Sequence, residues 1–149
     1  MASKTRVITL PAPSNVTYGL VRTAGSELKG FRLTREDPAG YYFKFARGFG
    51  WTNPTDLEVT IYQLDAQSSQ LRLDASILAL ADPFGFLTGT LDAFETHLRA
   101  LHQAMQTGAP PPPPPANNRA IVVNLVIIGV VVGGLLLFLS LAVLMTVLR

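Results

Sequence analysis

The segments LEVTIY (residues 57–62) and LRLDASI (residues 71–77) decide the fold of this chain. In both segments apolar and polar side chains alternate, with the apolar ones at odd-numbered positions. Successive side chains of a β-strand point to opposite faces of a sheet, so each segment would have one apolar face and one wet face. The short polar connection from Asp65 to Ser69 predicts that the two segments form an antiparallel hairpin. The apolar face of this hairpin then needs a cover.

The segment that follows Asp82 is predicted to supply this cover. Asp82 can cap a helix, and Pro83 suits its first position. Beyond them, apolar side chains recur at alternating steps of four and three residues, which places them on one helix face. These residues are Leu87, Leu91, Phe94, Leu98, Leu101 and Met105. We expect a long helix that lies across the sheet and ends at Gly108.

The N-terminal half adds further strands and a second helix. Apolar residues between Val16 and Leu28 recur at helical spacing, and Gly30 is expected to end that helix. Three more strands are predicted, at residues 6–10, 31–34 and 41–46. The chain is therefore predicted to be α+β, with an antiparallel sheet of about five strands covered on one face by two helices.

This pattern resembles that of a known class of domains. The predicted order β-α-β-β-β-β-α, the loop rich in glycine and aromatic residues before the hairpin, and the long final helix carry the resemblance. Small bacterial domains of uncharacterised function have this order and are often joined to a membrane segment or a short tail. The resemblance covers residues 6–105 at the level of pattern and implies the fold, but it carries no functional residue.

The C-terminal part of the chain has a different composition. Residues 1–106 are expected to form the folded domain, residues 107–119 a proline-rich linker and residues 120–149 a transmembrane helix. No charged residue occurs from Leu125 to Leu148, and about 20 apolar residues suffice to cross a bilayer. The proline run from Pro110 to Pro115 predicts a stiff spacer of roughly 20 Å, with a ligand for SH3 or WW domains as the alternative.

The position of the apolar segment predicts how it is inserted. Because it lies at the extreme C-terminus, we expect a tail-anchored, single-pass protein of a cell membrane with its folded domain in the cytoplasm. Gly129 and Gly133 form a G-x-x-x-G pair, and Ser140 follows on the same helical face. These three residues are expected to contact another membrane helix, unless the glycines merely reflect their frequency in such helices.

Several kinds of chemistry are excluded or disfavoured. The chain has no cysteine, so disulfides, thiolate metal sites and cysteine nucleophiles are excluded. His97 and His102 are five residues apart, on different sides of a helix, and are expected to be solvated rather than to bind a metal. The two positive charges in excess come from Arg119 and Arg149, so the composition does not favour nucleic acid as a partner. We expect no catalytic residue, no cofactor and no metal.

The loop that begins at Arg47 has a composition typical of binding surfaces. Arg47, Phe49 and Trp51 lie among glycines between a predicted strand and the hairpin, and such residue types are common at binding hot spots. They are predicted to bind a partner, with the alternative that the two aromatic side chains plug the end of the core.

These features lead to two hypotheses about function. The first is a non-enzymatic, tail-anchored accessory or scaffold subunit of a larger membrane complex, for example a respiratory or photosynthetic one. Its partner would be a membrane protein or a second copy of the chain. The second is a membrane-tethered domain that carries a lipid or another apolar ligand between the long helix and the sheet. Tyr41, Phe43 and Phe45 would line the ligand site.

Overall fold

The computed structural model describes residues 1–48, 54–82, 85–111 and 113–114. Within them the chain forms an α+β domain with the element order β-α-β-β-β-β-α, which confirms the predicted order. The elements are β1 (Ala2–Leu10), α1 (Ser14–Glu27), β2 (Phe31–Asp37), β3 (Tyr42–Arg47), β4 (Thr55–Gln63), β5 (Ser69–Ile77) and α2 (Phe86–Thr107).

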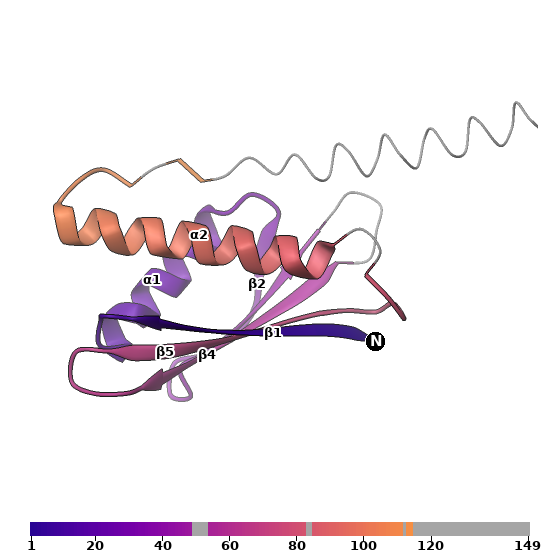
Figure 1. Cartoon of the computed structure of the whole chain (residues 1–149), viewed down its shortest axis with the longest axis horizontal. Helices are drawn as coiled ribbons and strands as arrows, with labels where there is room; N and C mark the ends of the chain where they lie inside the picture. Colours follow the sequence, from indigo (N-terminus) through magenta and orange to yellow (C-terminus); the bar gives the residue numbers. More distant parts are fainter. Residues whose placement is uncertain (49–53, 83–84, 112, 115–149) are drawn as a thin grey trace, which may run out of the picture.

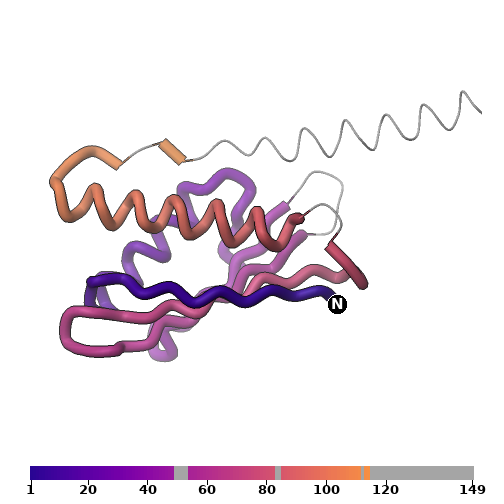
Figure 2. Tube along the Cα trace, in the orientation of Figure 1, coloured from indigo at the N-terminus to yellow at the C-terminus, as the bar shows by residue number. Residues whose placement is uncertain are grey.

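The five strands form one antiparallel sheet in the order β1-β5-β4-β3-β2. The hairpin of β4 and β5 forms as predicted, with Val59 opposite Leu73. The first strand of the chain pairs with the last, so β1 closes one edge of the sheet beside β5. Figure 2 shows the Cα trace of β1, in indigo, running beside that of β5.

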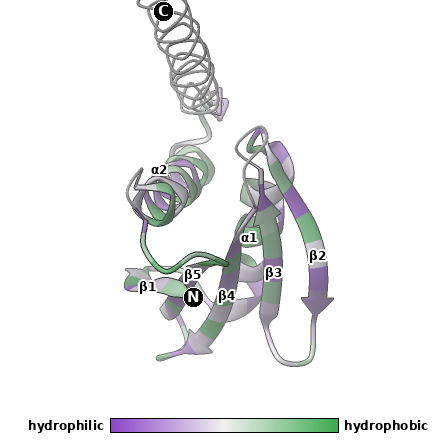
Figure 3. Ribbon diagram, turned by 90° about the vertical axis from the view of Figure 1, so that its right-hand side faces the viewer, coloured by the Kyte–Doolittle hydropathy of each residue, from purple (hydrophilic) through white to green (hydrophobic). Residues whose placement is uncertain are grey.

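The sheet has one buried face and one polar face. On β4 every second residue from Thr55 to Ile61 is buried, and the residues between them are partly exposed. On the opposite face the ammonium group of Lys44 lies 2.9 Å from a carboxylate oxygen of Asp56 and 3.2 Å from one of Glu58. The edge strand β2, with the sequence FRLTRED, is coloured as hydrophilic over much of its length in Figure 3. A polar edge of this kind discourages pairing with another sheet.

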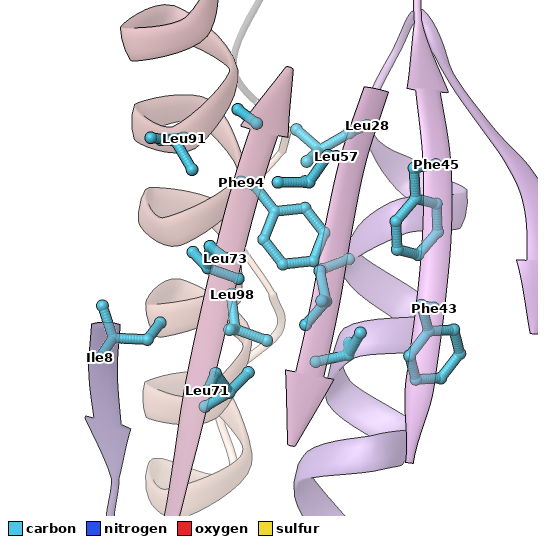
Figure 4. Close-up of a cluster of buried hydrophobic side chains, with 14 of the residues drawn as sticks. Ile8, Leu28, Phe43, Phe45, Leu57, Leu71, Leu73, Leu91, Phe94 and Leu98 are labelled. Atoms are coloured by element: carbon cyan, nitrogen blue, oxygen red, sulfur yellow. The ribbon is translucent and has the colours of Figure 1, made fainter. Parts of the chain in front are cut away.

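Both helices lie on the buried face, and α2 runs across the sheet (Figure 1). The predicted apolar stripe of α2 is buried from Leu87 to Leu101. Met105 was expected on the same stripe but is 50% exposed, because the last turn of α2 runs beyond the core cluster, which ends at Leu101. In the centre of the core, the ring of Phe45 lies 5.8 Å from that of Phe43 and 5.7 Å from that of Phe94 (Figure 4).

The histidines of α2 are not solvated, and that prediction is wrong. His97 is 1% exposed and His102 is 7% exposed. The imidazole Nε2 of His97 lies 2.8 Å from a carboxylate oxygen of Glu27, at the end of α1. The packing of α1 against α2 buries this face of α2, and the sequence of α2 alone does not show that contact.

The predicted membrane helix, residues 120–149, lies outside the described residues, and so do Gly129, Gly133 and Ser140. Within the part of the chain that the structure describes, no helix is both long and apolar enough to cross a membrane.

Candidate functional site

A row of core-facing side chains at one end of the sheet differs from the rest of the core. Phe31 of β2 is opposite Arg47 of β3, Arg47 is opposite Thr55 of β4, and Thr55 is opposite Ile77 of β5. Directly opposite residues of neighbouring strands have their side chains on the same face. Two polar residues, Arg47 and Thr55, therefore lie side by side on the buried face of the sheet, which carries mostly apolar side chains.

Arg47 is a buried cation that connects the sheet to the first turns of α2. The residue is 5% exposed. Its Nη1 donates a hydrogen bond of 2.6 Å to the carbonyl oxygen of Gly89 and one of 3.4 Å to the hydroxyl oxygen of Thr90. The guanidinium carbon lies 4.9 Å from the centre of the Phe31 ring, a favourable position for a cation–π contact. The positive charge is thus held in the interior, between the sheet and the start of α2.

Thr55 is the second polar residue of the row. It is fully buried, and its hydroxyl has no hydrogen-bond partner among the described residues. A buried hydroxyl without a partner loses its hydration and gains nothing in return, and such groups are rare in folded proteins. Packing alone therefore does not explain why a threonine, and not an apolar residue, occupies the position next to Arg47.

The start of α2, above this row, is fixed by contacts on two sides. Both carboxylate oxygens of Asp82 accept backbone hydrogen bonds, from Phe86 at 2.7 Å and Leu87 at 2.9 Å. Asp82 thus caps the first N–H groups of α2 as predicted, but the helix begins at Phe86, after Gly85, and not directly after Asp82. On the side of β1, Lys4 donates a hydrogen bond of 3.0 Å to the hydroxyl of Thr88.

One turn further along α2, Arg6 of β1 forms ion pairs of 2.8 Å with Asp92 and with Glu95. Glu95 also accepts a hydrogen bond of 2.8 Å from Arg99. Burial alone would raise the pKa of Glu95, but its hydrogen bonds from Arg99 and Arg6 outweigh burial, and the pKa is lowered. The carboxylate is thus kept charged, and its ion pair with Arg6 holds α2 against the edge strand β1, while Arg99 pairs with it within α2.

The middle of the core, next to this site, is apolar and aromatic. The ring centres of Phe31, in the same row as Arg47, and Phe94, in the core, lie 6.1 Å apart. Phe43 and Phe45 were expected to line a ligand site, but they are fully buried and pack among other core residues, while Tyr41 is only partly buried. The middle of the domain is therefore a packed core. At the far end of the sheet the buried hydroxyls of Thr17 and Ser69 pair with each other at 2.7 Å, whereas at the Arg47 end the hydroxyl of Thr55 has no partner among the described residues.

The structure places only part of the predicted binding loop. Arg47 was predicted to bind a partner, and its side chain lies in the interior. Phe49 and Trp51 lie outside the described residues. Sequence reasoning missed Thr55 and Thr90. Thr55 could have been found, because it is in phase with Leu57 in the alternating pattern and is therefore a polar residue at a core position.

The site offers hydrogen-bonding and cationic groups rather than metal ligands. In the described ranges, no three residues of His, Cys, Asp and Glu lie together as a metal site would require. Arg47 and the two threonines could contact an oxygen atom of a small molecule, and the neighbouring aromatic rings could contact its apolar part.

No model of a protein family matches the sequence, and no curated protein is detectably similar to it. Solved structures do share its fold. The di-domain aromatase/cyclase StfQ from the steffimycin biosynthetic pathway matches with a TM-score of 0.54 at 10% identity, over 70% of this chain and 46% of StfQ. DynU16, from the dynemicin biosynthetic locus, matches with a TM-score of 0.53 at 16% identity, over 72% of this chain and 48% of DynU16. An uncharacterised protein from Bacillus thuringiensis matches with a TM-score of 0.54 at 9% identity, over 70% of this chain and 99% of that protein.

These similarities establish the fold, a five-stranded antiparallel sheet with two helices, which the present chain shares with these proteins. The chain spans less than half the length of StfQ and of DynU16, and nearly the whole length of the Bacillus thuringiensis protein.

The comparisons correct the functional part of the sequence prediction. The chain was expected to be a non-enzymatic accessory or scaffold subunit, but it shares its fold with StfQ, an aromatase/cyclase from a biosynthetic pathway. The expectation that the chain is not an enzyme is corrected as well, because the fold of the chain is shared with a protein that is an aromatase/cyclase. The description as a tail-anchored membrane subunit gains no support from the described residues, in which no membrane-spanning helix occurs. The absence of known catalytic motifs from the sequence was therefore not sufficient ground to exclude an enzyme.

Proposed function

We propose that the domain binds an apolar small molecule between the first turns of α2 and the Arg47 end of the sheet. The observation that carries this proposal is the pair formed by Arg47 and Thr55, a buried cation beside a buried hydroxyl that has no hydrogen-bond partner among the described residues. Ligand sites in proteins have this composition, with apolar and aromatic walls and a few polar groups that orient the ligand.

The packing of the domain supports this location. The stacked rings of Phe43 and Phe45 fill the middle of the core, which leaves the end next to Arg47 as the part with groups suited to a ligand. Phe31 and Phe94 provide an aromatic surface between the two regions. The fold shared with StfQ also favours this reading, because an aromatase/cyclase has to hold an organic substrate.

A second candidate function is a reaction on the bound molecule. The observation in its favour is the guanidinium of Arg47, whose charge lies in a surrounding of low dielectric constant. A buried cation in such a position can stabilise negative charge that develops on a substrate oxygen during a reaction. The similarity to StfQ makes chemistry of the aromatase/cyclase kind the first to assay.

The membrane attachment predicted from residues 120–149 is independent of the ligand proposal and remains a prediction. Flotation with liposomes would test it, by comparing the full chain with a chain that ends at Pro114. We expect only the full chain to float. Flotation of neither chain would contradict the predicted attachment.

The binding proposal is tested by thermal unfolding of the full chain in the presence of a panel of apolar small molecules. A ligand that binds only the folded state raises its stability by RT ln(1 + [L]/Kd), so a ligand at 100 times its Kd adds about 2.7 kcal/mol. We expect at least one class of molecule to raise the melting temperature of the wild type and of R35M, but not of R47M. Arg35 is the matched control because it also lies over an aromatic ring, 5.9 Å from the centre of Tyr42, but in an exposed position. If R47M responds as strongly as R35M, the site is elsewhere.

A further inference from the structure

The geometry points to a ligand that is an apolar molecule with a carboxylate at one end, bound with that carboxylate facing Thr55 and Arg47. This inference rests on the proposed function and adds the chemical class and the orientation of the ligand. The class follows from the properties of the two residues and of their surroundings.

The hydroxyl of Thr55 favours a ligand with an oxygen atom at this position. It is fully buried and has no hydrogen-bond partner within the described part of the chain. A threonine hydroxyl can donate one hydrogen bond and accept others. A ligand oxygen next to Thr55 would give this hydroxyl its partner and remove the cost of leaving it unpaired.

The positive charge of Arg47 lies beside that hydroxyl and favours an anionic oxygen. Arg47 is directly opposite Thr55 in the register of β3 and β4, so their Cβ atoms are about 5 Å apart on the same face. The guanidinium is fixed by its hydrogen bond of 2.6 Å to the Gly89 carbonyl and by the ring of Phe31. A fixed positive charge in a surrounding of low dielectric constant attracts an anion more strongly than it would in water. A carboxylate therefore fits this place better than a neutral alcohol or ketone.

The neighbours of Arg47 and Thr55 in the row are apolar. Ile77 continues the row on the far side of Thr55, and Phe31 continues it on the far side of Arg47. Phe94 lies behind Phe31, with the ring centres 6.1 Å apart. The part of the ligand next to its carboxylate would thus meet aliphatic and aromatic side chains. An anion with a hydrocarbon body would suit both the polar pair and the apolar side chains around it, whereas a small hydrophilic anion would suit only the polar pair.

The test measures the affinities of the full chain for dodecanoate and for dodecan-1-ol, which have the same chain length and differ in the terminal group. Three proteins are compared: the wild type, T55V and T60V. Thr55→Val keeps the shape of the side chain and removes the hydroxyl. Thr60→Val makes the same change on the same strand, but on the opposite, partly exposed face.

We expect the wild type and T60V to bind dodecanoate at least tenfold more tightly than dodecan-1-ol. We expect T55V to lose about tenfold in dodecanoate affinity, as is typical for a lost hydrogen bond to a charged group, and to bind the alcohol nearly unchanged. Equal affinities for acid and alcohol in the wild type, or no effect of Thr55→Val, would overturn the inference and leave the proposed function standing. If neither compound binds and no other apolar molecule does, the proposed function itself fails.

Discussion

Gly25 of α1 packs directly against the ring of Phe45 in β3. A Cβ atom at residue 25 would lie 2.1 Å from Cε1 of Phe45, far inside the distance that two carbon atoms can approach. Phe45 is 1% exposed and stacked on Phe43, so its ring has little room to move. The absence of a side chain at Gly25 therefore allows α1 to approach the sheet closely.

Gly25→Ala is expected to destabilise the domain, because the added methyl group forces apart two packed elements. Overpacking of this kind costs about 1–3 kcal/mol, and the gain in helix propensity of up to about 1 kcal/mol offsets only part of it. Gly19→Ala is the matched control in the same helix, since nothing lies within 4 Å of the added Cβ there. Chemical denaturation should show G25A less stable than the wild type and G19A equally or more stable. If both variants are stabilised alike, α1 does not pack as described.

Thr55→Val is expected to stabilise the protein in the absence of ligand. The change replaces a buried hydroxyl that has no partner among the described residues with a methyl group of nearly the same size. Relief of an unpaired buried polar group is worth about 1–3 kcal/mol. Thermal unfolding of ligand-free T55V should therefore show a higher melting temperature than the wild type, while T60V should change little. A lower melting temperature for T55V would mean that the hydroxyl has a structural partner in the ligand-free protein.

The stability of the domain is expected to fall at alkaline pH because of Tyr18. Burial, followed by the hydrogen bond of 2.6 Å that the phenol donates to Glu36, raises the pKa of Tyr18 to about 12, from 10.0. A raised pKa means that the fold favours the protonated phenol. Its contribution is therefore fully present below pH 10 and is lost as the pH rises towards about 12. Tyr18→Phe should remove this part of the pH dependence, measured by denaturation between pH 9 and pH 12. An unchanged slope in Y18F would contradict the assignment.

The contact between β1 and α2 is expected to weaken in acid through Glu95. Its pKa is lowered because the hydrogen bonds from Arg99 and Arg6 outweigh burial. A lowered pKa means that the fold favours the carboxylate. The contribution is present above the ordinary value of 4.5 and is lost as the pH falls through the lowered value.

Glu95→Gln should flatten the acid side of the stability profile, measured by denaturation between pH 2 and pH 6. Asp92→Asn is the control, because Asp92 pairs with the same Arg6 but its side chain is 51% exposed against 19% for Glu95. The smaller effect is expected in D92N, since exposed ion pairs contribute little. An effect in D92N as large as that in E95Q would show that the lowered pKa of Glu95 is not the cause.

The sequence predicted the architecture well because local patterns determine most of it. The alternation in β4 and β5, the spacing of Leu87 to Leu101 and the cap at Asp82 each depend on neighbours in the chain. The burial of His97 depends on Glu27, which is 70 residues away, and no local pattern shows such a contact.

The candidate site was harder to predict for the same reason. Arg47 stood out by composition, but its role was assigned to an external partner because its contact with Gly89 comes from a distant helix. Thr55 was overlooked because it begins a strand, where a polar residue is unremarkable unless the alternation is followed to its end. The functional prediction went wrong because it rested on the absence of catalytic motifs, whereas the similarity to StfQ lies in the fold and leaves only 10% sequence identity.

The most direct test of the central claim is photo-crosslinking of the full chain with an uncharged aliphatic alcohol that carries a diazirine group. We predict that the label maps to peptides containing Arg47, Thr55 or the first turns of α2 from Phe86, and that an excess of unlabelled alcohol prevents the labelling. Labelling that is not competed, or that maps only to the polar face of the sheet around Lys44 or to residues 120–149, would contradict a ligand site between α2 and the sheet.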